Sequence, residues 1–197
     1  MPGGQERALR RRINSVQSTK QITRAMELIA ATRVVKAMTR ANAARPYSTK
    51  MTGVIEDLAA GGVGIDDPLL RSSETVSSIG FVVITSDRGL AGAYNSSVIR
   101  AAEKEIMAAQ TEGKEYKLVL VGKKAADYFR FRNYQIEASF SGMTDTPSYE
   151  DARVVATTVR DLFVSEAVDQ VILAYQEFVS MGTQRVAVRK FLPLESM

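Results

Sequence analysis

The stretch IGFVVITSDRGLAGAYN, residues 79–95, decides the fold of this chain. Its first seven residues form an apolar run of the kind found in strands that are buried on both faces. A turn with two glycines follows, and a helix is expected from about Asn95 to Glu112, where Gly113 ends it. A buried strand that leads directly into a helix is the repeating unit of α/β proteins.

The same alternation continues towards the carboxyl end. Residues 117–121 (KLVLV) predict a second buried strand. The later elements are expected in this order: a helix at Lys123–Phe131, a short strand at Gln135–Phe140, a helix that starts at Thr146–Pro147, and a hairpin of strands at Gln170–Tyr175 and Gln184–Leu192 around Met181–Gly182. The pattern therefore predicts an α/β body over residues 79–197, with a Rossmann-like open, mostly parallel sheet, helices on both faces and an antiparallel edge.

The helix after the third strand carries its own start signals. Thr146 is expected to cap it, Pro147 to lie in its first turn, and Glu150 and Asp151 to lie near its positive end. Its buried stripe is predicted to comprise Val155, Val159, Leu162 and Phe163.

Upstream of the body, residues 61–78 are interpreted as a linker and residues 1–60 as one long basic helix. Helix-forming residues dominate this segment, and it contains no proline between Glu6 and Arg45. Pro46 is expected to kink the helix. Apolar residues recur at steps of three or four within short groups and are interpreted as a stripe along one face that needs a partner helix: Leu9, Ile13, Val16, Ile22, Met26, Ile29, Val35 and Met38.

Charge separates the two parts of the chain. Residues 1–50 hold 11 Lys and Arg against 2 Glu, whereas the remainder holds 15 basic against 20 acidic residues. Such an asymmetry concerns how a protein meets its partners rather than how it performs chemistry.

Composition excludes several classes of site. The chain has no Cys and no His, which excludes disulfides, thiolate metal sites and catalysis by Cys or imidazole. Its longest apolar run is far below the roughly 20 residues that cross a bilayer, and the amino terminus lacks the features of a secretory signal. We expect no membrane insertion, no metal, no cofactor and no catalytic residue in a cytoplasmic protein.

The loop at residues 86–95 is the obvious place for a ligand, because α/β sheets bind ligands at the carboxyl ends of their strands. Gly89 and Gly92 do not complete a dinucleotide-binding fingerprint, and no phosphate-binding loop follows. We therefore expect a structural role: the glycines form tight turns, Asn95 caps the next helix, and Asp87 and Arg88 bond to local backbone or to each other.

Three sequence blocks resemble a known family. They are RINSVQSTKQITRAMELIAATR at 12–33, ARPY at 44–47 and SDRGLAGAYN at 86–95, and in this order and spacing they resemble the gamma subunits of bacterial F-type ATP synthases. The similarity runs from about Arg7 to Leu194; Ala91 stands where many members carry Cys. The family continues into a long C-terminal helix that winds around the first one, whereas this sequence ends at Met197. The chain is thus expected to be a fragment, a truncated form, or a stalk whose shaft is completed by something else.

The resemblance implies a non-catalytic rotor, the central stalk, that couples proton-driven rotation of the membrane c-ring to ATP synthesis in the beta subunits. Its implied partners are the alpha and beta subunits of the F1 hexamer, the epsilon subunit and the c-ring, at the cytoplasmic face of the bacterial cell membrane. Four residues match the family region that passes acidic loops of the beta subunits and form the hypothetical partner interface: Arg24, Met26, Arg33 and Lys36.

Two other functions fit single features. A nucleic-acid-binding protein would explain the basic helix, but groove-binding helices cluster their basic residues around a base-reading side chain, and here they are spread among alanines over several turns. A nucleotide-dependent enzyme would explain the α/β body, but the phosphate-binding fingerprints are missing.

Overall fold

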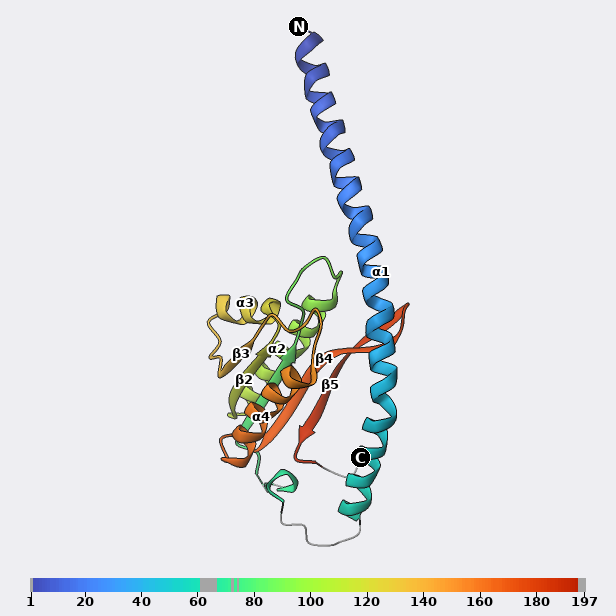
Figure 1. The fold of residues 1–197 in the computed structure, drawn as a ribbon. Helices are drawn as coiled ribbons and strands as arrows, with labels where there is room; N and C mark the ends of the chain where they lie inside the picture. The colour runs from blue at the N-terminus through green and yellow to red at the C-terminus, as the bar shows by residue number, and fades with distance from the viewer. Residues whose placement is uncertain (1, 61–66, 72, 74, 195–197) are drawn as a thin grey trace. The chain divides into compact units, whose positions relative to one another are not determined.

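The computed structural model describes residues 2–60, 67–71, 73 and 75–194 (Figure 1). It divides the chain into two compact units, Met1–Gly61 and Gly62–Met197. The first unit carries a long helix, and the second carries the sheet with its covering helices.

The first unit is a single α-helix, α1, at Pro2–Ala60, which confirms the predicted long amino-terminal helix. It is continuous through Pro46 and has 59 residues, a length of about 88 Å at the usual rise per residue. The predicted stripe along one face is wrong. Six positions separate Val16 from Ile22 and Ile29 from Val35, and in an unbroken helix each such step turns the apolar direction by about 120°.

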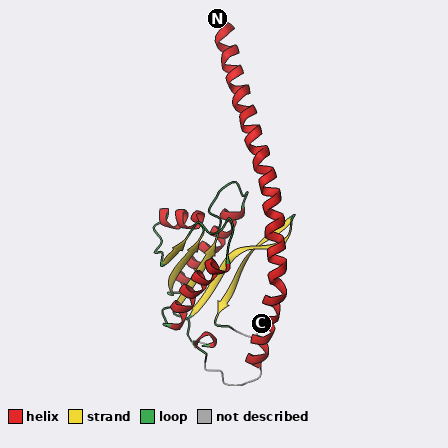
Figure 2. Ribbon diagram, in the orientation of Figure 1, coloured by secondary structure: helices red, strands yellow, loops and turns green. Residues whose placement is uncertain are grey.

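The second unit is built on a five-stranded sheet, shown in yellow in Figure 2. The strand order is β3-β2-β1-β4-β5, in which β1 to β4 run parallel and β5 pairs antiparallel with β4. The strands are β1 Ser78–Ile84, β2 Glu115–Val121, β3 Ala138–Phe140, β4 Gln170–Ser180 and β5 Thr183–Leu192. This arrangement confirms the predicted Rossmann-like sheet with an antiparallel edge.

Helices cover both faces of that sheet. On one face, α2 (Tyr94–Thr111) and α3 (Lys123–Phe131) pack over Phe81 and Val83 of β1. On the other, α4 (Tyr149–Val164) packs over Val82 through Val159 and Phe163. Successive residues of β1 thus face two different cores, which is why its sequence is continuously apolar.

A short 3-10 turn, η1 at Pro68–Leu70, lies near α4 and is held by the carboxylate of Asp67, which accepts a hydrogen bond from the Leu69 amide at 2.8 Å. Leu69 itself packs against the core beneath α4. This turn and α4 are the described helical elements on that face of the sheet.

The predicted start of α4 needs a correction. The helix begins at Tyr149, and its cap is Ser148 rather than Thr146. Ser148 has the extended backbone of an N-cap. Its hydroxyl accepts a hydrogen bond from the Asp151 amide at 3.2 Å, and the Asp151 carboxylate accepts one from the Ser148 amide at 2.9 Å. Thr146 and Pro147 precede this capping box and lie outside the helix. Glu150 and Asp151 do occupy the first turn, as predicted.

Candidate functional site

The carboxyl ends of β1 and β2 are joined by a close backbone contact. Thr85 donates its amide hydrogen to the carbonyl of Val121 at 2.8 Å, and Gly122 follows with a φ of 94°. A Cβ atom at Gly122 would lie 2.2 Å from the Thr85 carbonyl oxygen, closer than any side chain tolerates. Only glycine fits at position 122. Because the backbones of Thr85 and Gly122 are held in contact, the loops that follow β1 and β2 start from fixed positions.

Asp87 ties the loop after β1 to two more distant segments. Its carboxylate accepts hydrogen bonds from the Lys123 amide at 3.0 Å, the Thr144 amide at 3.1 Å and the Thr144 hydroxyl at 2.6 Å. Burial alone would raise the pKa of Asp87, but the hydrogen bonds from Thr144 and the backbone amides outweigh it and lower the pKa to about 2. Asp87 is therefore an ionised anchor and a poor proton acceptor.

Asp87 bonds to backbone amides as predicted, but the amides belong to distant segments, and neither Asp87 nor Arg88 pairs with the other. Arg88 forms an ion pair with Asp145 at 2.8 Å, next to the contact between Asp87 and Thr144. Both residues thus reach across to the loop that follows β3, because β1, β2 and β3 are adjacent and parallel and their carboxyl ends lie at one edge.

Asn95 is not the cap of α2, which begins at Tyr94 after Ala93 and has no side-chain cap. Asn95 lies inside the first turn, and its side-chain oxygen accepts a hydrogen bond from the Ser86 amide at 2.9 Å. Its amide nitrogen donates to the Ser86 hydroxyl at 2.9 Å. The residue closes the base of the loop instead of ending the helix.

The two loop glycines differ from each other. Gly92 has a φ of 56° and uses the conformational freedom that glycine provides. At Gly89 an added Cβ would meet only the end of the Lys124 side chain at 3.9 Å, an ordinary contact. The tight-turn role predicted for both is thus supported at Gly92 alone. Leu90, between them, has a φ of 61° and is 92% exposed.

In chemical terms the loop is a clasp. Its polar side chains bond to one another and to backbone, and the Asp87 carboxylate is saturated with donors. Within the described ranges, no three acidic side chains gather in a way that could hold a metal ion.

The basic residues of α1 were predicted as a partner interface, and the helix places them on two different sides. One side of α1 holds six residues within about 80° around the helix axis, and we call them the basic outer face: Ile22, Met26, Ile29, Arg33, Lys36 and Arg40. Arg24 is nine positions from Arg33, which is about two and a half turns, so it points to the opposite side. Its guanidinium pairs with Glu27 of the same helix at 2.8 Å.

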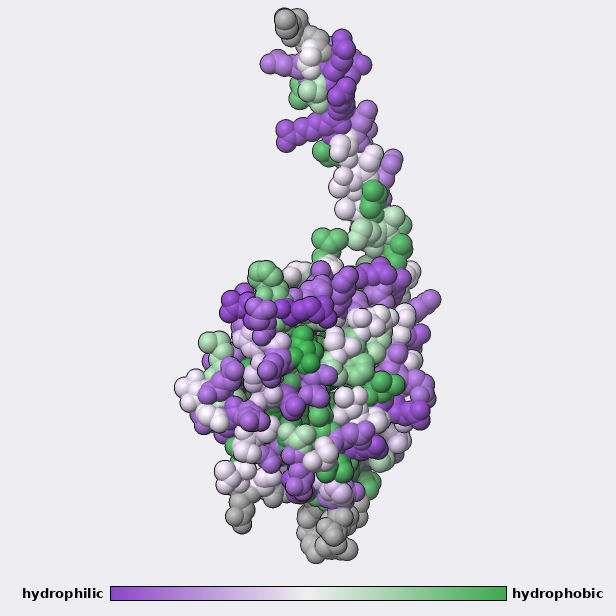
Figure 3. Space-filling model, turned by 90° about the vertical axis from the view of Figure 1, so that its left-hand side faces the viewer, coloured by the Kyte–Doolittle hydropathy of each residue, from purple (hydrophilic) through white to green (hydrophobic). Residues whose placement is uncertain are grey.

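The regular spacing of a second set of positions on α1 was not predicted, although the sequence indicates that the alanines in it would let a partner helix approach closely. Steps of alternately three and four residues connect mostly small or apolar residues along a path that drifts around the helix by about 20° for every seven residues, and we call this path the small-residue seam. Its members from Leu9 to Ile55 are Leu9, Ile13, Val16, Lys20, Thr23, Glu27, Ala30, Val34, Ala37, Ala41, Ala44, Ser48, Met51 and Ile55. The seam contains no Arg, and its alanines supply the signal that could have identified it. Figure 3 shows hydrophilic side chains crowded along the amino-terminal part of the helix.

Comparison with known proteins places these features in a family. A family model described as ATP synthase matches residues 5–197. The ATP synthase gamma chain of Kineococcus radiotolerans is 44% identical over 196 residues, which cover 98% of this chain and 65% of the relative. The gamma chain of Frankia casuarinae is 45% identical over 195 residues, covering 97% and 65%. This chain belongs to the ATP synthase gamma-chain family.

The family assignment confirms the resemblance drawn from the three sequence blocks. The chain spans about 65% of the length of the curated gamma chains it matches. Among solved structures, the central stalk and c-ring of the Tetrahymena thermophila mitochondrial ATP synthase matches with a TM-score of 0.53 and 22% identity over 77% of this chain and 71% of that one, a likeness of fold alone. None of the helices in the described part of this gamma-family chain has the length and hydropathy needed to cross a bilayer.

Proposed function

We propose that this chain acts as the rotor, the central stalk, of an F-type ATP synthase and couples proton-driven rotation of the c-ring to ATP synthesis in the beta subunits. The observation that carries the proposal is the family match over residues 5–197. The chain would lower no chemical barrier itself. It would transmit torque between sites that its partners carry.

The two sides of α1 support this function. A 59-residue helix with exposed apolar groups cannot bury them within itself, so it needs neighbours. The small-residue seam suits close packing against another helix, since alanines let two backbones approach. The basic outer face suits acidic surroundings, for which we propose the acidic loops of the beta subunits.

The interface hypothesis then becomes specific. Met26, Arg33 and Lys36 would meet the beta subunits from the basic outer face, while Arg24, on the other side and engaged with Glu27, would contribute less. Exposed ion pairs contribute only about 0–1 kcal/mol each, so such contacts would guide a rotating shaft without locking it.

The remaining partners follow from the same proposal. Alpha and beta subunits would surround α1, and the α/β body would contact the epsilon subunit and the c-ring at the cytoplasmic face of a bacterial membrane. The chain would be held there through the complex and would not insert into the bilayer. The comparisons give no support to a nucleic-acid-binding protein.

Charge reversal in a complete complex tests the proposal. The double variant Arg33→Glu/Lys36→Glu should reduce proton-driven ATP synthesis by reconstituted complexes by up to about 30-fold, given about 0–1 kcal/mol for each of the two exposed pairs. Arg24→Glu should have a smaller effect. The matched control Arg153→Glu/Arg160→Glu makes the same charge change on exposed residues of α4 and should leave synthesis near the wild-type rate. Equal losses in the double variant and its control would contradict the proposed interface.

DNA binding separates the two explanations of the charge. If Arg33 and Lys36 neutralised phosphates, the wild-type chain would bind duplex DNA with an affinity that falls steeply with salt, and the double variant would flatten that slope by about two units. We expect only weak, non-specific binding at physiological salt. Sequence-discriminating binding that the double variant loses would refute the rotor function for α1.

Nucleotide binding provides a further check. We expect calorimetry to detect no tight binding of ATP to the isolated chain, because its sequence has no phosphate-binding loop. Stoichiometric binding in the micromolar range would contradict a purely mechanical role.

A further inference from the structure

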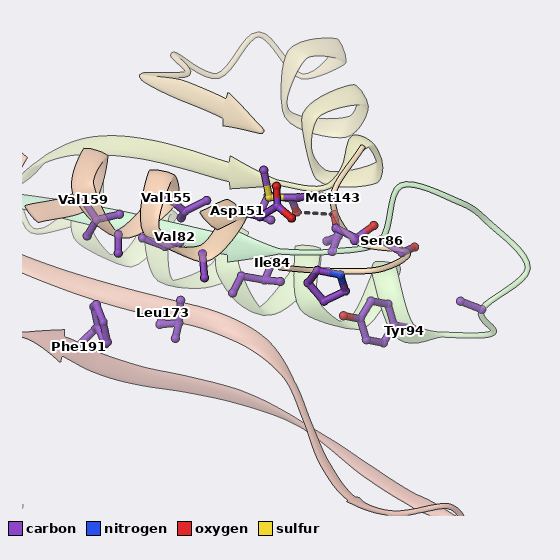
Figure 4. A pocket seen from close by; sticks show the side chains of 17 residues that line it. Val82, Ile84, Ser86, Tyr94, Met143, Asp151, Val155, Val159, Leu173 and Phe191 are labelled. Atoms are coloured by element: carbon purple, nitrogen blue, oxygen red, sulfur yellow. Dashed lines mark hydrogen bonds between the residues drawn. The ribbon is translucent and has the colours of Figure 1, made fainter. Parts of the chain in front are cut away.

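The α/β body contains a cavity of about 690 Å³ at the carboxyl ends of its parallel strands. Its floor is the sheet, through Ile84 and Leu173, and one wall is α4, through Val155 and Val159 (Figure 4). Phe191 of β5 lies on the opposite side from α4. This volume falls within the roughly 300–1,000 Å³ of pockets that bind small molecules.

The cavity exists because α4 covers only part of its face of the sheet. α4 packs over Val82, Val119 and Val171, which belong to the centre of the sheet. Leu173 and Phe191, further along β4 and β5, are only partly covered, and Phe191 remains 45% exposed. The gap beside α4 is thus bordered by aliphatic and aromatic carbon on its sheet and helix sides.

One polar group is aimed into this apolar space. The hydroxyl of Tyr94, at the start of α2, points towards the cavity in Figure 4 and makes no hydrogen bond with the described residues. Burial raises the pKa of Tyr94, which keeps the phenol protonated and able to donate. This hydroxyl is not among the buried side-chain atoms that lack a partner, so solvent reaches it, and a ligand acceptor would take the place of water there.

The other polar residues at the rim are already engaged. Ser86 bonds to Asn95, Thr144 bonds to Asp87, and Asp151 closes the capping box with Ser148. The described lining contains no Lys or Arg, and Asp151 is its charged member. An anion such as a nucleotide phosphate would meet a carboxylate here with no cation to offset it.

We propose that this cavity binds a small, uncharged, largely apolar molecule that carries one hydrogen-bond acceptor, with Tyr94 as the donor. Apolar walls supply the affinity, the Tyr94 hydroxyl fixes the orientation, and Asp151 excludes anions. The site is independent of the proposed rotor function, since all of its residues belong to the α/β body and none to α1.

Two fluorescent probes test the proposal on the full chain. Prodan is uncharged and carries a ketone acceptor, whereas N-phenylnaphthylamine is uncharged and lacks a comparable acceptor. Both should bind saturably to the wild type with blue-shifted emission. Tyr94→Phe should weaken prodan by about 2- to 12-fold, the range of one hydrogen bond, and leave N-phenylnaphthylamine unchanged. Equal loss of both probes in this variant would refute the role of the hydroxyl.

A cavity-filling variant locates the site. Ala156 lines the cavity from α4, so Ala156→Trp should weaken both probes by about tenfold or more by occupying the space. Val154 is an exposed residue of the same helix outside the cavity lining, and Val154→Trp is the matched control. Circular dichroism would establish that both variants keep the fold. Similar binding in the two tryptophan variants would overturn the assignment.

Two further outcomes test the class of ligand. Anilinonaphthalene sulfonate, an anionic relative of N-phenylnaphthylamine, should bind several-fold more weakly because of Asp151. Equal or tighter binding of the anion would contradict the uncharged class. Displacement of both probes by purified epsilon subunit at stoichiometric concentration would assign the cavity to a protein interface and refute the small-molecule site.

Discussion

Isoleucines of α1 and of the α/β body meet opposite environments. Ile13 and Ile29 of α1 are each 53% exposed, whereas Ile106 of α2 is 0% exposed and Ile79 of β1 is 6% exposed. The side chains are chemically the same, and the difference is whether the unit supplies a surface for them. The helices of the body cover both of its cores, whereas the first unit has no second described element that could cover the apolar side chains of α1. Apolar residues in a sequence thus predict that a surface becomes buried, but they do not tell whether the same chain or a partner molecule covers it.

Amide hydrogen exchange should reveal the largest difference between the two units. Isolated helices depend on tertiary contacts for their stability, so amides from Leu9 to Met38 of the isolated chain should exchange at least about 100-fold faster than those of β1 and β2, unless the helix associates with another molecule. Mass spectrometry at several protein concentrations would measure both. Slow exchange in α1 at a concentration where the chain is monomeric would show that the helix is stable by itself.

Truncation of a core side chain should sharpen the comparison. Phe163→Ala removes a ring that is 0% exposed and lies beneath the Arg71 guanidinium at 4.9 Å, and it should lower the free energy of unfolding of the body by about 3–5 kcal/mol. Ile13→Ala should leave it unchanged, since Ile13 lies in the other unit and alanine is a better helix former.

Near-ultraviolet circular dichroism during denaturation can follow the body selectively, because six of the chain's 7 tyrosines lie outside α1. Phe131→Ala is a control within the body, since that ring is 83% exposed and its loss should cost little. A loss in Phe163→Ala no larger than in Phe131→Ala would mean that the body core is not packed as described.

The Asp87 clasp should give the body an acid-sensitive contribution to stability. The pKa of Asp87 is about 2 in the folded chain against 3.8 for an ordinary Asp. Its contribution is therefore complete above the ordinary value and is lost as the pH falls from about 4 towards 2. With allowance for solvent screening, we expect Asp87→Asn to cost on the order of 1–2 kcal/mol at neutral pH and progressively less in acid.

Urea denaturation at pH 7 and pH 3 would measure this dependence. Asp161→Asn removes a carboxylate that pairs with its exposed neighbour Arg160, and it should change the free energy of unfolding by less than about 0.5 kcal/mol. A cost of Asp87→Asn that is the same at both pH values would rule out the proposed electrostatic anchor.

The smallest effect concerns the start of α4. Ser148→Ala removes the capping hydroxyl and should cost about 1 kcal/mol, whereas Thr146→Ala should be nearly neutral because Thr146 lies outside the helix. Thermal unfolding of the two variants compares the cap observed with the cap expected from the sequence. A larger shift for Thr146→Ala would place the cap where the sequence predicted it.

Much of the body could be predicted because its signals are local. Buried strands such as residues 117–121 stand out as apolar runs, and their alternation with helices determines the sheet type. The partners of Asp87 and Arg88 could not be predicted in this way. Thr144 and Asp145 lie far along the chain and come close only because three parallel strands end at one edge.

Two other misses have local causes. Thr146 and Ser148 are both acceptable caps by residue type, and the choice depends on backbone angles and on the reach of Asp151, which the sequence does not display. The small-residue seam, in contrast, was present in the sequence. Its alanines indicate already in the sequence that a partner helix could approach closely, and only their regular spacing from Leu9, which carries the same periodic information as the large apolar residues, was not part of the prediction.

Pro46 gives α1 a mechanical property. Because proline has no amide hydrogen, the carbonyl of Asn42 lacks its usual helical donor, and the helix is softer at this point than elsewhere along its length. Pro46 lies about 180° around the helix from the neighbouring seam positions Ala44 and Ser48. The missing hydrogen bond is therefore on the side of the helix away from the seam, and the helix opens most easily on that side. As a result, α1 bends preferentially in one direction, towards whatever molecule packs against the seam.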